Sequence, residues 1–427
     1  MKKGWRGHWH RAKAAVGMVS DTYIVSFAST LGALVYLVIK ALGPHQFITF
    51  GIPREARVWY EGVFIFDKGL SIAVTYAWPL ITMSALFGIE IAWQSTRWVL
   101  GCAWVFAFAY PALYETVFRD VYIRNRQLMT VPVYIVYFFV LWLCGWRVAC
   151  HPRVQWPRFY LFFTFPMACA GGLAWLYDRV IFDTVWTLDN DTVIIVIRLL
   201  VHPVVMAVFI FSVRMATRRL VRYDLFRVSF LYVIVAQWMM VDSLYGRLLI
   251  LSLRQVESVV LSILGISISR IVFRSTFKER EAAIFWLGRR LCCCFGDFSF
   301  VVPPPGGGDG GHAAEELQRQ RSDYVALDII IESFAVVIIP LCIVVYRVRP
   351  LDIDATLTTV ILQLAAEFVT DCVCVYIDDW RGVKTIEHWN TRQQKSFSAW
   401  IFLQLSVGMV YVLFSFSAYI MKIKHLD

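Results

Sequence analysis

The sequence predicts an all-α, polytopic membrane protein, on three observations. Of its 427 residues, 59% are hydrophobic and only 17% are charged, and the mean hydropathy is +0.61. Soluble domains are about half apolar and a quarter charged. Apolar runs of about 20 residues, the length that crosses a bilayer, recur along the whole chain. The 17 Trp, 19 Tyr and 32 Phe agree, because aromatic side chains fill bundle cores and anchor helices at membrane interfaces.

The apolar runs predict about 11 transmembrane helices, within a range of 10–12. They cover residues 18–41, 69–93, 98–117, 130–149, 158–181, 192–213, 228–252, 256–274, 326–347, 356–377 and 398–421. The first run is too long for the apolar part of a signal peptide, so we expect it to be retained. Between the first two runs, residues 43–68 contain Pro44 and Pro53 and predict an interfacial or re-entrant segment.

These runs divide the chain into a bundle of about eight helices over residues 18–274 and one of about three over 326–421. A basic tail (1–17) precedes them, and a short tail (422–427) follows. The loop between the bundles, 275–325, has two parts. "FKEREAAIFWLGRRLCCCF" mixes basic and apolar residues as interfacial helices do, and "VVPPPGGGDGGHAAEELQRQRSD" is typical of a linker.

The basic residues predict that the N-terminus lies inside and the C-terminus outside. In that orientation the cytoplasmic segments hold about 25 Lys and Arg and the outer segments about 12, which follows the positive-inside rule. An outer loop with Arg119, Arg124 and Arg126 argues against it. The net charge of +10 is then explained by contact with the anionic inner leaflet, so we expect lipid rather than nucleic acid as the partner.

Three adjacent cysteines, Cys292, Cys293 and Cys294, follow the basic stretch of the long loop. Adjacent thiols do not have the spacing of a zinc site or a redox pair, whereas such a cluster beside a membrane is typical of S-acylation. We expect acylation here, and it would place the protein in a eukaryotic plasma membrane or endomembrane. Unmodified, buried cysteines are the alternative.

Two predicted spans carry acidic pairs at helical spacing. Glu367 and Asp371 are four residues apart, as are Asp328 and Glu332, so each pair shares one helix face. A rise of about 1.5 Å per residue places Glu367 near mid-membrane, with Asp371 and Glu332 about 10 Å from the cytoplasmic edge. Because a short hairpin joins the two spans, we expect all four carboxylates at one level.

Arg270 falls at a similar depth and is the expected counter-charge. One guanidinium cannot neutralise four carboxylates, so some of them must be protonated, solvated or bound to a cation. Charged side chains inside a span usually face a cavity or a partner, which makes a functional site the default reading. Structural polar packing is the alternative.

A second polar level is expected toward the outer leaflet. Arg198 and His202 are four residues apart in one span, and Asp242 falls at a similar depth in the next, which predicts an Arg198–Asp242 ion pair. Arg247 is expected nearer the outer surface. Together these residues predict the outer part of a polar route.

The sequence therefore predicts a transporter or channel for a cation, or one coupled to protons. Asp328, Glu332, Glu367 and Asp371 would bind the ion, and Arg270 would balance their charge. The alternative is a non-catalytic receptor or scaffold that acts through its basic loop. A membrane enzyme is disfavoured, because we find no nucleophile with its base and no metal-ligand motif. No cofactor is expected, and the sequence leaves a metal ion open.

Overall fold

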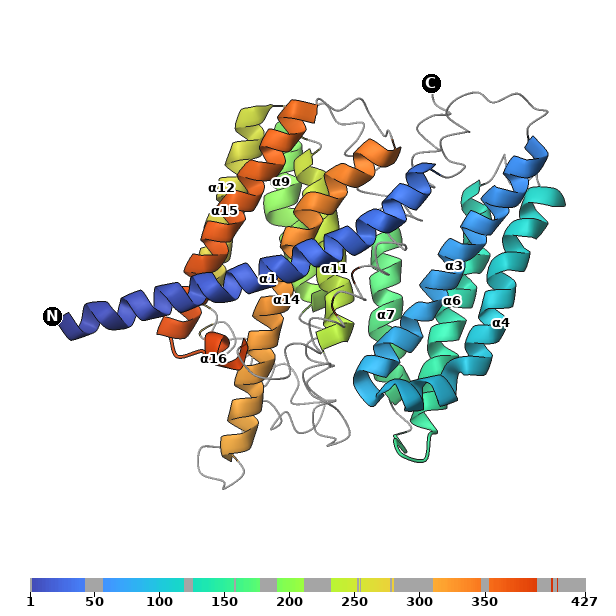
Figure 1. Ribbon diagram of the computed structural model, residues 1–427, viewed down its shortest axis with the longest axis horizontal. Helices are drawn as coiled ribbons and strands as arrows, with labels where there is room; N and C mark the ends of the chain where they lie inside the picture. The colour runs from blue at the N-terminus through green and yellow to red at the C-terminus, as the bar shows by residue number, and fades with distance from the viewer. Residues whose placement is uncertain are drawn as a thin grey trace. The chain divides into compact units, whose positions relative to one another are not determined.

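The computed structural model of the chain is helical throughout the part that it describes (Figure 1). The described residues are 2–42, 57–118, 126–156, 159–176, 190–210, 232–251, 253, 255–276, 279, 310–346, 353–389, 401 and 405. The helices are α1 (Lys2–Leu42), α3 (Arg57–Phe87), α4 (Ile89–Thr116), α6 (Arg126–Ala149), α7 (Phe159–Leu176), α9 (Asp191–Val196), the π-helical turn η3 (Ile197–Val201), α11 (Tyr232–Leu251), α12 (Val256–Ser275), α14 (Gly310–Tyr346), α15 (Ile353–Trp380) and α16 (Thr385–Trp389).

The all-helical prediction is confirmed, and the described part of the chain holds seven helical segments that are long and apolar enough to cross a membrane. They are Gly7–Val35, Lys68–Phe87, Val131–Ala149, Asp191–Ile210, Val256–Ser275, Arg321–Cys342 and Thr356–Trp380. α4 and α11, where we predicted spans, are helices but are not among the seven. The count of about eleven and the orientation remain predictions.

The chain forms two compact units, and two helices contribute to both. Unit 1 comprises Met1–Phe27, Val185–Val336 and Ile353–Ser398. Unit 2 comprises Ala28–Thr184, Val337–Asp352 and Ala399–Asp427. α1 and α14 each pass from one unit into the other.

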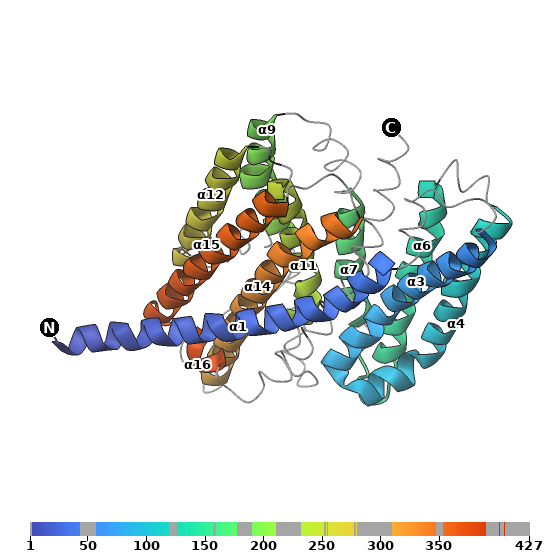
Figure 2. The same ribbon diagram turned by 45° about the horizontal axis from the view of Figure 1, so that its top comes forward.

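Unit 2 is built on α3, α4, α6 and α7, and α3 packs closely along α4 (Figure 2). The Tyr76 hydroxyl donates to the Val133 carbonyl (3.0 Å), which ties α3 to α6.

Between α3 and α4, Gly88 has φ 87° and ψ 154°, a conformation that essentially only glycine adopts. We predicted that the break between these two helices would lie between residues 93 and 98, which was wrong, because the structure places it at Gly88. Residues 57–68 of the predicted interfacial or re-entrant segment are helical and continue into α3, and their position at an interface remains a prediction.

In unit 1, α12 and α15 lie side by side in both ribbon views (Figures 1 and 2), and α12 also packs on α9, η3 and α11. α14 begins at Gly310, within the segment that we predicted as a linker. The segment "HAAEELQRQR" is rich in strong helix formers, so once the glycine run ends it joins the apolar helix behind it.

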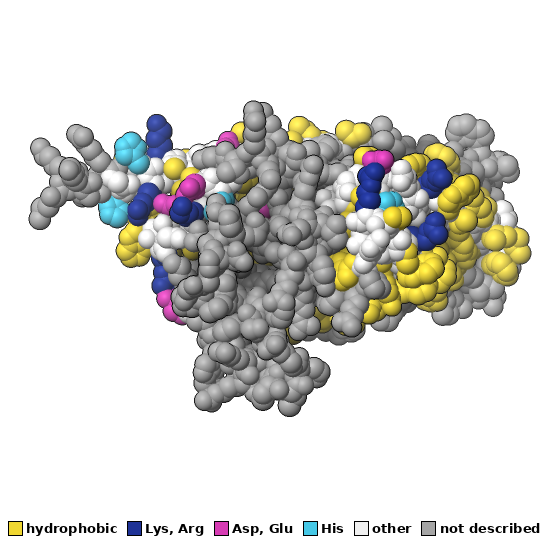
Figure 3. Space-filling model, turned by 90° about the horizontal axis from the view of Figure 1, so that it is seen from below, with side chains coloured by type: hydrophobic (Ala, Val, Ile, Leu, Met, Phe, Trp, Pro, Cys, Tyr) yellow, Lys and Arg dark blue, Asp and Glu magenta, His cyan; other side chains and the backbone are white. Residues whose placement is uncertain are grey.

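The membrane-type helices of unit 1 expose apolar side chains and bury polar ones. On α12 the exposed side chains include Leu264 and Ile268, whereas Ser258 and Ser262 are buried. α15 exposes Ile361 and Val369 and buries Glu367 and Asp371. Water would favour the opposite distribution, so this pattern indicates a lipid environment. Figure 3 shows two groups of ionisable side chains at the surface of the face drawn, one of them around the N-terminal part of α1.

Candidate functional site

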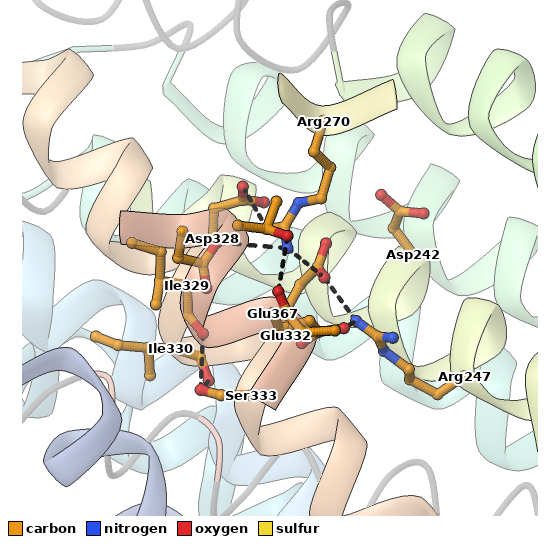
Figure 4. A network of polar contacts seen from close by, with 12 residues as sticks. Asp242, Arg247, Arg270, Asp328, Ile329, Ile330, Glu332, Ser333 and Glu367 are labelled. Carbon is orange, nitrogen blue, oxygen red and sulfur yellow. Dashed lines mark hydrogen bonds and ion pairs between the residues drawn. The ribbon is translucent and has the colours of Figure 1, made fainter. Parts of the chain in front are cut away.

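Unit 1 contains buried ion pairs within its long apolar helices, and we name this group the ionic cluster (Figure 4). Its members are Arg247 on α11, Arg270 and Arg274 on α12, Asp328 and Glu332 on α14, and Glu367, Asp371 and Asp378 on α15. Figure 4 shows Arg247 and Arg270 reaching in from two helices, with the carboxylates of Glu332 and Glu367 between them.

Glu332 lies at the centre of the cluster and is shared by two guanidinium groups. Its Oε2 atom is 2.7 Å from Arg247 Nη2 and 3.1 Å from Arg270 Nη1. The same Arg247 Nη2 also pairs with Glu367 Oε1. Because Arg247 is almost fully buried, each of these contacts acts in a low-dielectric environment, where ion pairs are stronger and unpaired charges cost more.

The cluster continues from Arg270 toward the C-terminal end of α12. Arg270 Nη2 lies 3.2 Å from Asp328 Oδ2, and that oxygen is also 2.8 Å from Arg274 Nη2. Arg274 Nη1 is 3.7 Å from Asp378 Oδ2. Guanidinium and carboxylate groups thus alternate along the cluster, from Glu367 at one end to Asp378 at the other.

The contacts also show how the three helices run. Arg270 contacts Asp371 and, one turn on, Arg274 contacts Asp378, so α12 and α15 run in the same direction. Asp328 contacts Arg274, whereas Glu332, one turn later on α14, reaches back to Arg270, so α14 runs opposite to α12. The four-residue spacing of Asp328 and Glu332 aligns both carboxylates with the arginine face of α12, whereas on α15 Asp371 faces α12 and Glu367 faces Arg247 on α11.

Asp371 is held more loosely than Asp328 and Glu332, although its side chain is only 4% exposed. Oδ1 is 3.4 Å from Arg270 Nη1, and Oδ2 is 3.5 Å from the hydroxyl of Tyr23 on α1. A charge-assisted hydrogen bond is normally 2.7–2.9 Å. Two further buried oxygens, Glu367 Oε2 and Asp378 Oδ2, have no hydrogen-bond partner. The cluster therefore has acceptor capacity that the side chains around it do not use.

Five carboxylates in the cluster face three guanidinium groups. The predicted imbalance of four carboxylates to one Arg270 was too large, because Arg247 and Arg274 also take part. Arg198 also acts on Glu332, and Arg321 and Arg381 act on Asp378. The cluster is therefore distinguished less by its count of charges than by incomplete hydrogen bonding of buried charged groups, which is costly. The described residues contain no group of three or more His, Cys, Asp or Glu side chains arranged to hold a metal ion.

A second polar group lies on η3 and α11, and its pairing differs from the prediction. His202 Nε2 is 2.7 Å from Asp242 Oδ1 and 3.0 Å from the Asp242 carbonyl oxygen, so Asp242 pairs with His202 rather than with Arg198. Arg198 lies in the π-helical turn, where the backbone N–H of His202 donates to the Ile197 carbonyl. That turn breaks the α-helical spacing on which the predicted Arg198–Asp242 pair depended.

Arg198 is buried, with 8% of its surface exposed, and its Nε atom has no hydrogen-bond partner. The guanidinium lies against the backbone of Gly246 on α11, where a Cβ atom would be only 2.7 Å from Arg198 Cζ. Asp242 and Glu332 are the acidic side chains nearest to it, and Arg247 is a neighbouring positive charge. Arg198 therefore lies between the His202–Asp242 pair and the ionic cluster.

The structure brings together most residues that the sequence singled out, but sequence reasoning missed four. Arg247 was expected nearer the outer surface, and the sequence did not single out Arg274, Asp378 or Tyr23. Side chains on a helix lean toward its N-terminus. For Arg247 and Arg274 that direction leads into the cluster. The lean of helix side chains could therefore have predicted that both arginines belong to it.

The predicted S-acylation residues Cys292, Cys293 and Cys294 lie outside the described residues, so that hypothesis remains a prediction. Comparison of the chain with protein-family models, with characterised proteins and with solved structures finds no match.

Proposed function

We propose that this protein carries protons across a membrane, alone or coupled to a second solute, and that Asp371 and Glu367 bind the proton. The observation that supports the proposal is the incomplete hydrogen bonding of two carboxylates buried in apolar helices. The contacts of Asp371 are 3.4 and 3.5 Å long, and Glu367 Oε2 has no hydrogen-bond partner. Burying a charge without a partner costs several kcal/mol, so a proton on one of these carboxylates relieves an otherwise unfavourable arrangement.

The proton is favoured over a larger cation by the way the carboxylates are already occupied. Each of the five has a guanidinium nitrogen within 3.7 Å, which a metal ion would have to displace. A proton needs only one free oxygen lone pair. Glu367 Oε2, which has no hydrogen-bond partner, and the loosely held oxygens of Asp371 offer such positions.

Arg270 connects proton binding to a rearrangement of the cluster. When Asp371 is protonated it is neutral, and Arg270 interacts with Asp328 and Glu332, which it already contacts at 3.2 and 3.1 Å. When the proton leaves, the Asp371 carboxylate competes for Arg270 again. The His202–Asp242 pair and Arg198 form the part of the proton route that precedes the cluster, because Asp242 is partly exposed and Arg198 lies next to Arg247.

The test is proton flux in liposomes that contain the purified protein, a pH-sensitive dye inside and a membrane potential set by potassium and valinomycin. The wild-type protein should acidify or alkalinise the interior according to the sign of the potential. Asp371→Asn and Glu367→Gln should each lower this flux by at least about tenfold, since they remove the proton acceptor. Asp354→Asn, at an exposed carboxylate in the first turn of α15, is the matched control and should retain it.

Equal flux in the wild-type protein and in Asp371→Asn would overturn the proposal, as would wild-type flux no higher than in protein-free liposomes. Either result would favour ion pairs that only hold the helices together. It would return attention to the receptor or scaffold hypothesis, whose basic loop lies mostly outside the described residues.

A further inference from the structure

The N-terminal half of α1 contacts α15 at three levels. His8 Nδ1 lies 2.7 Å from the Tyr376 hydroxyl, and Arg11 Nε is 3.4 Å from Asp379 Oδ2. Farther along α1, the Tyr23 hydroxyl donates to Asp371 Oδ2 at 3.5 Å. A helix at the beginning of the sequence therefore touches both the surface end of α15 and the carboxylate to which we assign the proton.

These three contacts differ in burial, and the difference indicates which of them can connect the ionic cluster to α1. The His8 and Arg11 contacts are at least partly exposed, and exposed pairs of this kind hold helices weakly. Tyr23 is only 7% exposed, and its ring packs edge-on against Phe368, with centroids 5.3 Å apart. The Tyr23 hydroxyl is thus the contact through which a change inside the cluster can reach α1.

We infer that Tyr23 is a positioning residue that transmits the protonation of Asp371 to α1. This inference rests on the proposed function. The charged groups that face Asp371 from the elements around it are Arg270 and Arg274 on α12 and Asp328 and Glu332 on α14, with Tyr23 as the titratable group from α1. All four charged groups are themselves ion-paired within the cluster. The Tyr23 contact links the cluster to α1.

The chemistry of the contact changes when Asp371 binds a proton. An ionised Asp371 carboxylate attracts the Tyr23 O–H more strongly than a neutral carboxyl group does, even across the 3.5 Å of this contact. Once the carboxyl group is protonated, the bond becomes neutral, and the Asp371 O–H can itself donate to another acceptor. α1 is then held to α15 mainly by the Tyr23 ring and the exposed His8 and Arg11 contacts. Protonation therefore loosens α1 from α15.

The first experiment compares pH profiles of proton flux for Tyr23→Phe and Tyr376→Phe. Tyr23→Phe keeps the ring against Phe368 but removes a donor that favours the ionised carboxylate, so the pH of half-maximal flux should rise by about 0.5–1 unit. Tyr376→Phe also removes one hydroxyl contact with α1, but at the exposed end of α15, and should leave the profile unchanged. An unshifted Tyr23→Phe profile, or the same shift in both variants, would overturn the inference.

A second experiment measures the loosening without flux. Spin labels at the exposed positions 13 and 380, which take part in none of the three contacts, report the distance between α1 and α15 by pulsed electron paramagnetic resonance in the full chain with its native cysteines replaced. The distance distribution should broaden at acid pH in the otherwise unsubstituted protein. It should not respond to pH in Asp371→Asn. A pH response that persists in Asp371→Asn would assign it to another group and overturn the inference.

The two hypotheses fail in different ways. If Asp371→Asn abolishes flux while Tyr23→Phe keeps the wild-type pH profile, the proposed function stands and the role of Tyr23 falls. If Asp371→Asn retains full flux, the proposed function falls. If the α1–α15 distance still responds to pH only when Asp371 is present, the contact depends on protonation but serves a purpose other than proton transport.

Discussion

Gly246 is a residue whose missing side chain matters to the site, because it makes room for the buried guanidinium of Arg198. Gly246→Ala would place a Cβ atom 2.7 Å from Arg198 Cζ, so the arginine must shift within a packed and polar environment. We expect a loss of about 1–3 kcal/mol in the free energy of unfolding, the usual cost of overpacking. Thermal unfolding in nanodiscs is the measurement.

Gly101→Ala is the control for that substitution. Gly101 also lies inside a helix, α4, but a Cβ atom there would meet nothing within 4 Å. Alanine at this position should leave stability unchanged or raise it by about 0.5–1 kcal/mol, because glycine loses more backbone freedom on helix formation. Equal effects of the two substitutions would mean that Arg198 does not depend on the space above Gly246.

At the residue scale, the sequence predicted which side chains meet better than it predicted how they pair. The predicted counter-charge Arg270 does contact Asp328, Glu332 and Asp371, whereas Glu367 pairs with Arg247 instead. The pairing of Asp242 with His202 could not be predicted, because a π-helical turn leaves no clear signal in the sequence. Such turns occur often at functional sites.

At the scale of the element, α12 and α15 should face lipid with the apolar side that they expose. Spin labels at Ile268 and at Val369, both 62% exposed, should collide often with oxygen, which is concentrated in lipid, and rarely with a water-soluble nickel chelate. A label at Glu387 on α16, which is exposed and charged, should show the reverse. Strong nickel collisions at 268 and 369 would contradict the assignment of these helices to a membrane.

Helix boundaries were predicted less well than helix positions. α3 and α14 both begin well before the spans predicted for them, and for the same reason. Residues 57–68 of α3 and 310–320 of α14 are less apolar than the spans that follow them, so a hydropathy pattern ends where each helix still continues. Helix formation depends on backbone hydrogen bonds and side-chain propensity as well as on apolar character. Hydropathy predicts the part of a helix that lipid can cover and not the part that extends beyond it.

At the scale of the whole molecule, the distribution of Lys and Arg predicts a cytoplasmic N-terminus and an outer C-terminus. Epitope tags fused before Met1 and after Asp427 test this in sealed microsomes treated with protease. The N-terminal tag should be digested, because the cytoplasmic face of a microsome is outside. The C-terminal tag should survive until detergent opens the vesicle. Digestion of both tags in sealed vesicles would show an even number of crossings.

The contact between Tyr23 and Asp371 has a further consequence, for the order in which the protein is made. The two residues are 348 positions apart, and a ribosome adding about 5–20 residues per second needs roughly 20–70 s to go from one to the other. α1 is therefore synthesised long before α15 exists. Its contacts with α15 cannot form until most of the chain has been made.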